Sequence, residues 1–214
     1  MRATPLLIGA AVAAAGLGAY GRRFRSWQLQ WGSDEAEPKD DLPGDDLIRS
    51  TGLTATRSIT IGAPPERVWP WIAQLGQGRG GFYSYDLLEN LIGCDIHNAA
   101  RVVARWQDTT VGDEVMLAPE IALRVALVEP ERTLVLNGVV PVSVGAPPCD
   151  FTWAFVLREQ QDGTTRLIVR ERYAYLRWWA PLIIEPVELL SFLMTRKMLT
   201  GIKRRAEETA MPLH

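Results

Sequence analysis

The most constraining feature of this sequence is a series of short β-type segments that ends in one long amphipathic helix. Alternating, β-branched or apolar residues fill segments 114–117, 121–128, 133–136, 151–158 and 165–175, with turn signals between them. Consecutive strands joined by short turns form an antiparallel meander, and the apolar face of such a sheet must be covered. The only large amphipathic element available is the final segment, 186–206, where apolar residues recur at helical spacing: Leu190, Leu193, Met194, Met198 and Ile202. We therefore expect an α+β fold in which a curved antiparallel sheet wraps around a long C-terminal helix.

Another strand and two short helices precede this series. Residues 56–61 alternate and are β-branched, which predicts a strand. A helix should begin at residues 63–66, where proline is tolerated in the first turn, and a second should cover 85–92 before Gly93. The pair Asn137-Gly138 is a strong turn signal and predicts that the strand at 133–136 ends there.

The first 32 residues form a segment of their own. Residues 5–20 carry no charge and are followed by a basic flank of Arg22, Arg23 and Arg25. As a helix the run would span about 24 Å, less than the roughly 30 Å hydrocarbon core of a bilayer. Three alternatives stay open: a membrane anchor, a cleaved signal peptide whose A-x-A site is supplied by Ala13 and Ala15, or a buried or frayed helix. The basic flank favours a cytoplasmic domain for an anchored chain, whereas cleavage implies secretion.

An acidic stretch separates this segment from the rest. Residues 33–50 contain several like charges, two prolines and a glycine, which predicts a solvated linker. Residues 51–210 then form the folded domain.

Composition excludes several function classes. The formal net charge is −2, so nothing provides the basic face that a nucleic acid requires. There are only two histidines, one of them the terminal His214, and Cys94 and Cys149 form no CxxC pair, so we expect neither a metal nor a cofactor. Eight tryptophans favour a pocket or an interface. We expect a monomer.

Two stretches carry a family resemblance. Residues 63–72 (APPERVWPWI) and 80–99 (GGFYSYDLLENLIGCDIHNA) resemble a bacterial branch of the SRPBCC (START/polyketide cyclase-like) superfamily. The resemblance covers roughly residues 50–208 and implies the helix-grip (START-like) fold. It implies no single activity, because the superfamily includes lipid carriers, hormone receptors, cyclases and ring-hydroxylase subunits, and it has no universal catalytic motif.

The last strands supply most of the candidate site residues. Glu171 and Tyr173 share one face with Leu167 and Val169, so an inward face would place a carboxyl group in an apolar cavity as an acid, base or ligand anchor. Alternatively the strand bends, or Glu171 pairs with a buried arginine. Trp153 and Phe155 share a face of the neighbouring strand and are candidate cavity-wall residues, although the opposite face is apolar too.

Other candidates lie in the loops and on the final helix. Asp95 could orient His97 for acid–base work, but a loop histidine without a nearby nucleophile is more often structural. Residues 76–81 imitate a phosphate loop but follow a helix, so a tight loop or a mobile lid is the better interpretation. The remaining candidate ligand contacts are Phe82, Tyr83, Leu193 and Met194.

Three functions follow from these observations. The first is binding of a hydrophobic small molecule that is lipid-, isoprenoid- or polyketide-like. The second is a polyketide cyclase or dehydratase, which requires at least two of Glu171, Tyr173 and His97 to face one cavity. The third is a membrane-associated scaffold without a ligand. The sequence contains no HExxH motif and no Ser-His-Asp or Cys-His arrangement, so whether the protein is an enzyme stays open.

Overall fold

The computed structural model describes residues 21–85, 90, 95–119, 121–140, 149–175 and 179–208. Residues 21–29 are helical. The other elements, in chain order, are η1 (Asp45–Leu47), β1 (Leu53–Ile61), α2 (Pro65–Ala73), η2 (Ala104–Trp106), β2 (Glu114–Ala118), β3 (Ile121–Glu129), β4 (Thr133–Val140), β5 (Cys149–Glu159), β6 (Thr165–Tyr173) and α4 (Pro181–Glu208).

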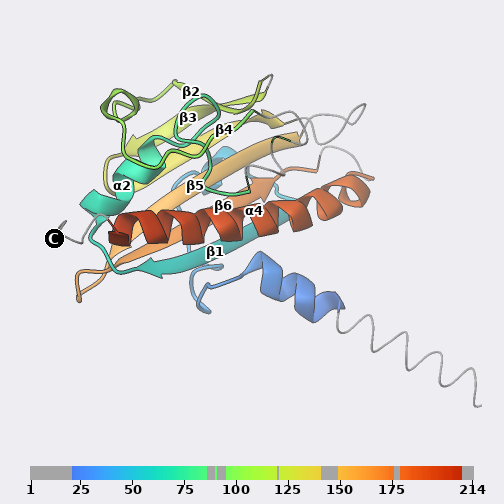
Figure 1. Ribbon diagram of the computed structural model, residues 1–214. Helices are drawn as coiled ribbons and strands as arrows, with labels where there is room; N and C mark the ends of the chain where they lie inside the picture. The colour runs from blue at the N-terminus through green and yellow to red at the C-terminus, as the bar shows by residue number, and fades with distance from the viewer. Residues whose placement is uncertain are drawn as a thin grey trace, which may run out of the picture.

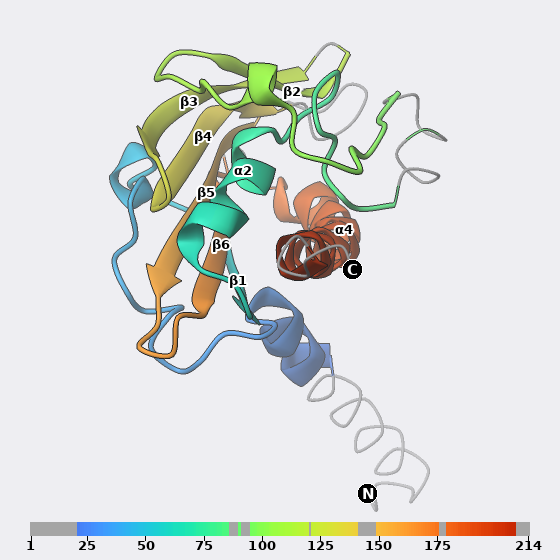
Figure 2. The same cartoon turned by 60° about the vertical axis from the view of Figure 1, so that its left-hand side comes forward.

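The six strands form one antiparallel sheet with the order β1-β6-β5-β4-β3-β2. The first strand closes the meander by pairing with the last, from Leu53 opposite Tyr173 to Ile61 opposite Thr165. On one side of the sheet α4 packs against β1 and α2, and α2 packs against β5 (Figures 1 and 2). This arrangement confirms the helix-grip fold. Most of the second short helix expected at 85–92 lies outside the described residues.

The turn predicted at Asn137-Gly138 is wrong. Strand β4 continues through both residues, with Asn137 opposite Thr152 and Gly138 opposite Phe151 of β5. Pairing with a neighbour on each side outweighs the turn preference, because Asn137 also faces Arg124 of β3. Gly138 instead lets β4 pack closely against Leu123, since a Cβ atom at Gly138 would lie 2.9 Å from Cδ2 of Leu123.

The hairpin between β5 and β6 forms where it was expected. The amide of Gln160 donates to the carbonyl of Thr164 over 2.8 Å. Gly163 adopts a φ of 77°, in the left-handed region that glycine enters without strain. The carboxylate of Asp162 accepts from the amide and the hydroxyl of Thr164 at 3.0 and 2.7 Å, so the turn residues hold the register of both strands.

Only part of the stripe predicted for α4 faces the sheet: Met198 and Ile202 are buried as expected, but the N-terminal half of the helix differs. Its buried positions repeat every three or four residues, with Met198 beside them: Ile184, Glu188, Phe192, Thr195, Leu199, Ile202 and Ala206. Leu190 and Leu193 lie on the outer side, 43% and 44% exposed, and Met194 is half-buried. Apolar periodicity misplaced the N-terminal half of this helix because its inner face is polar there.

The acidic segment 33–48, here called the strap, lies on the outer face of the sheet, opposite α4. It is not the solvated linker that its composition predicts. Glu37 is 3% exposed, and Leu42 packs against Val156 and Ile168 in a small cluster of its own. The hydroxyl of Ser58 in β1 donates to Glu37 over 2.8 Å, so the strap is joined to the sheet by polar contacts as well. The domain limits assigned from sequence stay a prediction.

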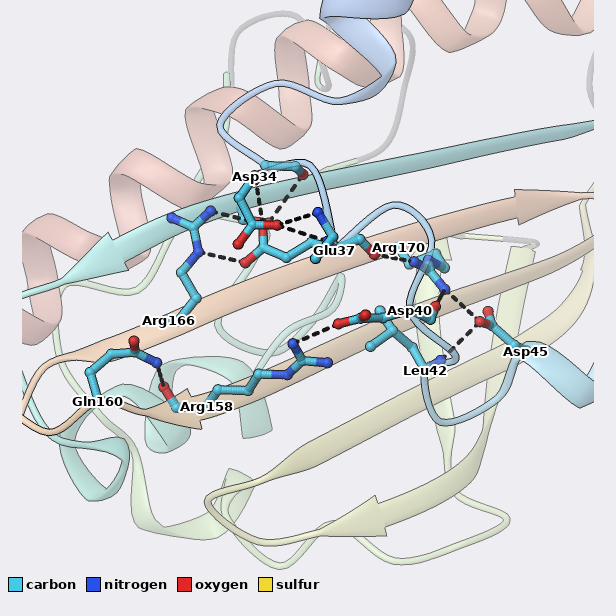
Figure 3. A network of polar contacts seen from close by, with 12 residues as sticks. Asp34, Glu37, Asp40, Leu42, Asp45, Arg158, Gln160, Arg166 and Arg170 are labelled. Carbon is cyan, nitrogen blue, oxygen red and sulfur yellow. Dashed lines mark hydrogen bonds and ion pairs between the residues drawn. The ribbon is translucent and has the colours of Figure 1, made fainter.

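Basic residues of β5 and β6 attract the strap's acidic side chains (Figure 3). Arg166 is paired with Glu37 at 2.7 Å, and the guanidinium of Arg170 bonds the Asp45 carboxylate. Arg158 pairs with Asp40 at 2.9 Å in a more exposed position. The carboxylates of the strap therefore neutralise arginines on the outer face of the sheet, which would otherwise be covered without a compensating charge.

The ion pairs of the strap should make the free energy of unfolding decrease at acidic pH, and a Glu37 variant tests this expectation. Burial raises the pKa of this carboxyl group, but bonds from Arg166, Ser58 and the Asp34 amide outweigh burial and hold the pKa below the usual 4.5. A carboxylate with a lowered folded pKa stabilises the protein fully above its unfolded pKa and loses that effect as pH falls through the folded value. Glu37→Gln should therefore cost about 1–3 kcal/mol at pH 7, and less as the pH falls below about 4.5.

Urea unfolding of Glu37→Gln and wild type at neutral and acidic pH measures this difference. Glu35→Gln is the matched control, because Glu35 is exposed on the same strap and should change stability by less than about 0.5 kcal/mol. A Glu37→Gln penalty that stays constant down to acidic pH would contradict the assignment.

In the part of the chain that the structure describes, no helix combines the length and the apolar character needed to cross a bilayer. The apolar run 5–20 lies outside the described residues, so the anchor and signal-peptide alternatives stay predictions.

Candidate ligand site and its buried polar cluster

Alternation along β5 settles which face is the inner one. Phe151, Trp153 and Phe155 belong to the main core on the α2 and α4 side of the sheet. Val156 belongs to the small cluster under the strap, on the opposite face. Both faces of β5 are apolar because both are covered, one by helices and one by the strap. Trp153 and Phe155 therefore lie on the inner face. Their role as cavity-wall residues stays a prediction.

An aromatic cluster lines this inner face. The ring of Trp153 lies 4.8 Å from Phe155 and 5.8 Å from Phe82, measured between centroids. Phe151 and Tyr173 are 4.7 Å apart across the β5–β6 pair. These rings come from two strands and from the loop after α2, so the sheet and that loop together form an aromatic surface.

One polar atom in this cluster is unsatisfied. Nε1 of Trp153 has no hydrogen-bond partner among the described residues, although the side chain is only 9% exposed. Burying such a donor without an acceptor costs about 1–3 kcal/mol. Tryptophan usually finds a partner when buried, so this N–H is a donor available to an acceptor placed against the cluster.

Glu171 lies opposite Trp153 in the β5–β6 register and is 2% exposed. Its carboxylate accepts four hydrogen bonds, two on each oxygen. The donors are Tyr173 Oη at 3.0 Å, Ser191 Oγ at 2.7 Å, Thr195 Oγ1 at 2.6 Å and an Arg57 Nη at 3.2 Å. Four donors fill the lone-pair sites of a carboxylate, so Glu171 has no free position from which to take a substrate proton.

Arg57 is the centre of this polar cluster and is 1% exposed. It bonds Glu171 of β6 and Glu188 of α4, and its Nε donates to the backbone carbonyl of Gln28 over 3.0 Å. The side-chain amide of Gln28 donates in turn to Glu188 over 2.7 Å. The guanidinium also lies 5.3 Å from the ring of Phe192. The cluster thus joins the 21–29 helix, the sheet and α4, and the predicted alternative that Glu171 pairs with a buried arginine is confirmed.

Tyr173 is a hydrogen-bond donor in this environment. Burial first, and then the negative charge of Glu171, raise the pKa of its phenol well above the usual 10. The phenol stays protonated near neutral pH and donates to Glu171. It cannot act as a base there, because a base must first lose its own proton.

His97 does not join the other two candidate catalytic residues. Its side chain is 82% exposed and lies 3.1 Å from Asp95, which is 78% exposed. Asp95 orients the ring as the sequence suggested, but on the open surface. Of the three candidates, only Glu171 and Tyr173 meet, and they are bonded to each other.

Tyr83 and the glycine loop serve packing. Tyr83 is 2% exposed, its hydroxyl accepts from Gln74 over 2.8 Å, and Arg205 of α4 lies 4.6 Å from its ring. Burial raises the pKa of this phenol to about 12. In the loop, Gly76 and Gly81 bond each other in both directions, and Arg79 donates to backbone carbonyls of Ala73 and Trp106. The loop's arginine is therefore already bonded within the protein.

The structure thus gathers five of the nine candidate residues and separates four. Phe82, Trp153, Phe155, Glu171 and Tyr173 come together on or beside the inner face. Leu193 points outward and Met194, next to it on α4, is half-buried. His97 is on the surface, and Tyr83 packs between α2 and α4.

Arg57 and Glu188 were missed by the sequence interpretation. Arg57 has the same parity in β1 as Leu53 and Ile61, so strand alternation already placed its side chain on the inner face. The burial of Glu188 was less evident from the sequence, because a glutamate in an amphipathic helix usually faces water. Among the described residues, no group of three acidic, histidine or cysteine side chains could hold a metal ion.

No family model and no curated protein matches the sequence. Solved structures do: a Polyketide_cyc-like protein, Cgl2372, from Corynebacterium glutamicum is 17% identical, covers 78% of this chain and 100% of its own, with a TM-score of 0.42. Protein NE0264 from Nitrosomonas europaea is 16% identical over 73% of this chain and 96% of its own, with a TM-score of 0.47. CalU16 from Micromonospora echinospora is 16% identical over 72% and 84%, with a TM-score of 0.36.

The chain has the helix-grip fold, which is the fold that the sequence resemblance to the SRPBCC superfamily implied. Its own strand order and the packing of α4 carry this statement, and it is a statement about fold. Structures at this level of identity say nothing of which molecule an SRPBCC domain binds or transforms.

Proposed function

We propose that this helix-grip domain binds a hydrophobic small molecule, lipid-, isoprenoid- or polyketide-like, against the inner face of the sheet beside α4. The single observation that carries the proposal is the buried N–H of Trp153, which no described residue accepts, within an aromatic cluster. Ligand sites are typically apolar and aromatic, with a few polar groups that fix orientation. The surroundings of Trp153 have this composition.

The surrounding residues also specify which polar group the ligand should carry. Trp153 offers one donor and no acceptor. The nearby carboxylate of Glu171 already accepts from four donors, so it has no free lone pair for a hydrogen-bond donor on the ligand. The ligand that fits best is therefore a largely apolar molecule with one carbonyl, ether or hydroxyl oxygen directed at Trp153.

The cyclase alternative has less support. Its proton-transfer residues would be Glu171 and Tyr173, and the two are bonded to each other, with the phenol's pKa raised. If they served only the stability of the fold, a folded Glu171→Gln protein would still bind the ligand. Turnover of a polyketide-like substrate that Glu171→Gln abolishes, with binding intact, would favour the enzyme.

Native mass spectrometry of gently purified full-length protein tests the proposal directly, because a retained ligand adds its mass. Long-chain fatty alcohol, farnesol and a hydroxyanthraquinone are the probes for titration by calorimetry. A protein that carries no added mass and binds none of the probes would overturn the proposal and leave the scaffold hypothesis.

Replacing Trp153 with phenylalanine should weaken binding of an oxygen-bearing probe by about tenfold, because the ring is kept and the donor is lost. Trp106→Phe is the matched control, since Trp106 lies in η2 and pairs with Arg105. Equal affinities for the two variants would show that Trp153 is only packing.

A further inference from the structure

A patch of exposed apolar side chains lies where the 21–29 helix meets α4. We call Phe24, Trp27, Leu189 and Leu193 the apolar patch. They are 40%, 49%, 41% and 44% exposed. Large apolar residues that gather on one surface mark an interaction site more often than scattered ones do.

Ring contacts and helical spacing join the four residues. Phe24 and Trp27 have centroids 5.7 Å apart, and Trp27 meets the edge of Phe192 at 5.4 Å. Leu189 lies three residues before Phe192, so both belong to the flank of α4 that faces the 21–29 helix. Leu193 lies at the outer edge of that flank, about 100° around the helix from Phe192. Figures 1 and 2 both show the 21–29 helix beside α4.

Basic residues border the patch. Arg22, Arg23 and Arg25 are exposed on the same short helix as Phe24 and Trp27. In the sequence, the uncharged run 5–20 directly precedes this helix. Apolar and aromatic side chains beside arginines are the composition of segments that lie in a membrane interface.

We infer that the apolar patch docks on the surface of an anionic lipid bilayer, with the arginines among the headgroups. A second copy of the chain fits less well. A symmetric dimer would bring the same patch of each copy together, and with it two sets of arginines. Four side chains are also far fewer than the roughly 20–30 residues that each partner contributes to a stable protein interface. This inference does not depend on the ligand proposed above.

Flotation of full-length protein with lipid vesicles tests the inference. The probes are vesicles of phosphatidylcholine alone and of phosphatidylcholine mixed with phosphatidylglycerol. We expect binding to the mixed vesicles that weakens as salt is raised, because salt screens arginine–headgroup attraction. Arg23→Gln should weaken it by about fivefold.

The double variant Leu189→Ser/Leu193→Ser should lower the partition coefficient on anionic vesicles by at least about tenfold, because two apolar side chains no longer enter the interface. Leu47→Ser/Val111→Ser is the matched control, as these residues are 45% and 63% exposed away from the patch. Light scattering on the same samples reports the oligomeric state. Vesicle binding by the patch variant equal to wild type would overturn the inference, and so would a dimer that this variant alone makes monomeric.

Discussion

Replacing Arg57 with methionine should lower the free energy of unfolding by about 3–5 kcal/mol. The variant keeps an unbranched, apolar stem and removes the charge and the hydrogen-bond donors. Glu171 and Glu188, 2% and 0% exposed, would then stay buried without the guanidinium that lies between them. The backbone carbonyl of Gln28 would lose its donor as well. Removing one partner of a buried ion pair is costly because the charge left behind is no longer compensated.

Urea unfolding followed by circular dichroism measures this loss. The matched control is Arg124→Met, because Arg124 also pairs with a glutamate, Glu114, but with both side chains more than half exposed. Surface pairs contribute about 0–1 kcal/mol, so the control should hardly change stability. A loss below about 1 kcal/mol for Arg57→Met would mean that the polar cluster does not stabilise the fold.

Strand parity was the most reliable information in the sequence. It grouped Glu171 and Tyr173 on one face of β6, and that face is the inner one. Arg166, Arg170 and Arg172 have the opposite parity and lie on the outer face, where they pair with the strap. A period of two follows from the pleat itself, so it holds wherever a strand forms. The order of strands and the final helix then sufficed for the helix-grip fold.

Two local rules failed where contacts distant in sequence decide the structure. The Asn137-Gly138 pair favours a turn, yet β4 runs through it because β3 and β5 both pair there. In α4, apolar spacing favoured Leu190 and Leu193 as inner residues, but the inner stripe is Glu188, Ser191 and Thr195. Those polar residues face inward because they bond to charged groups of the sheet. Glu188 pairs with Arg57, and Ser191 and Thr195 donate to Glu171.

The candidate site was only half visible in the sequence. Trp153 could not be assigned to a face because β5 is apolar on both sides, and its outer face is covered by Leu42 of the strap. That cover was not expected, since the strap's composition is that of a solvated segment. Nothing local in an acidic stretch shows that it will meet buried arginines more than a hundred residues later in the chain.

The second large loss of stability is expected when Arg170 is replaced, because Arg170 bonds the strap at three places. This residue is 3% exposed and donates to the carbonyls of Glu37 and Asp40 at 2.6 and 2.8 Å, and to the Asp45 carboxylate. Its Nε bonds Thr56 of the neighbouring strand at 3.0 Å. Replacing Arg170 with methionine leaves these acceptors without their charged donor and should cost about 3–5 kcal/mol.

The loss should appear first as local opening of the strap. Hydrogen exchange of the full-length variant should accelerate at strap amides such as Lys39 and Asp45, which bond to carbonyls within the strap. Amides in the centre of β5 and β6 should keep their order of protection, because their strand pairing does not involve the guanidinium.

Arg158→Met separates this role from a general loss of positive charge. Arg158 also bonds the strap, through the Asp40 carboxylate, but it is 42% exposed, and an exposed pair should change stability by less than about 1 kcal/mol. If Arg170→Met and Arg158→Met leave strap exchange equally slow, the strap is held by Leu42 packing and by Glu37 instead of by Arg170. If only Arg170→Met opens it, one buried guanidinium keeps an acidic N-terminal segment on the sheet and so keeps the outer side of β5 covered behind Trp153.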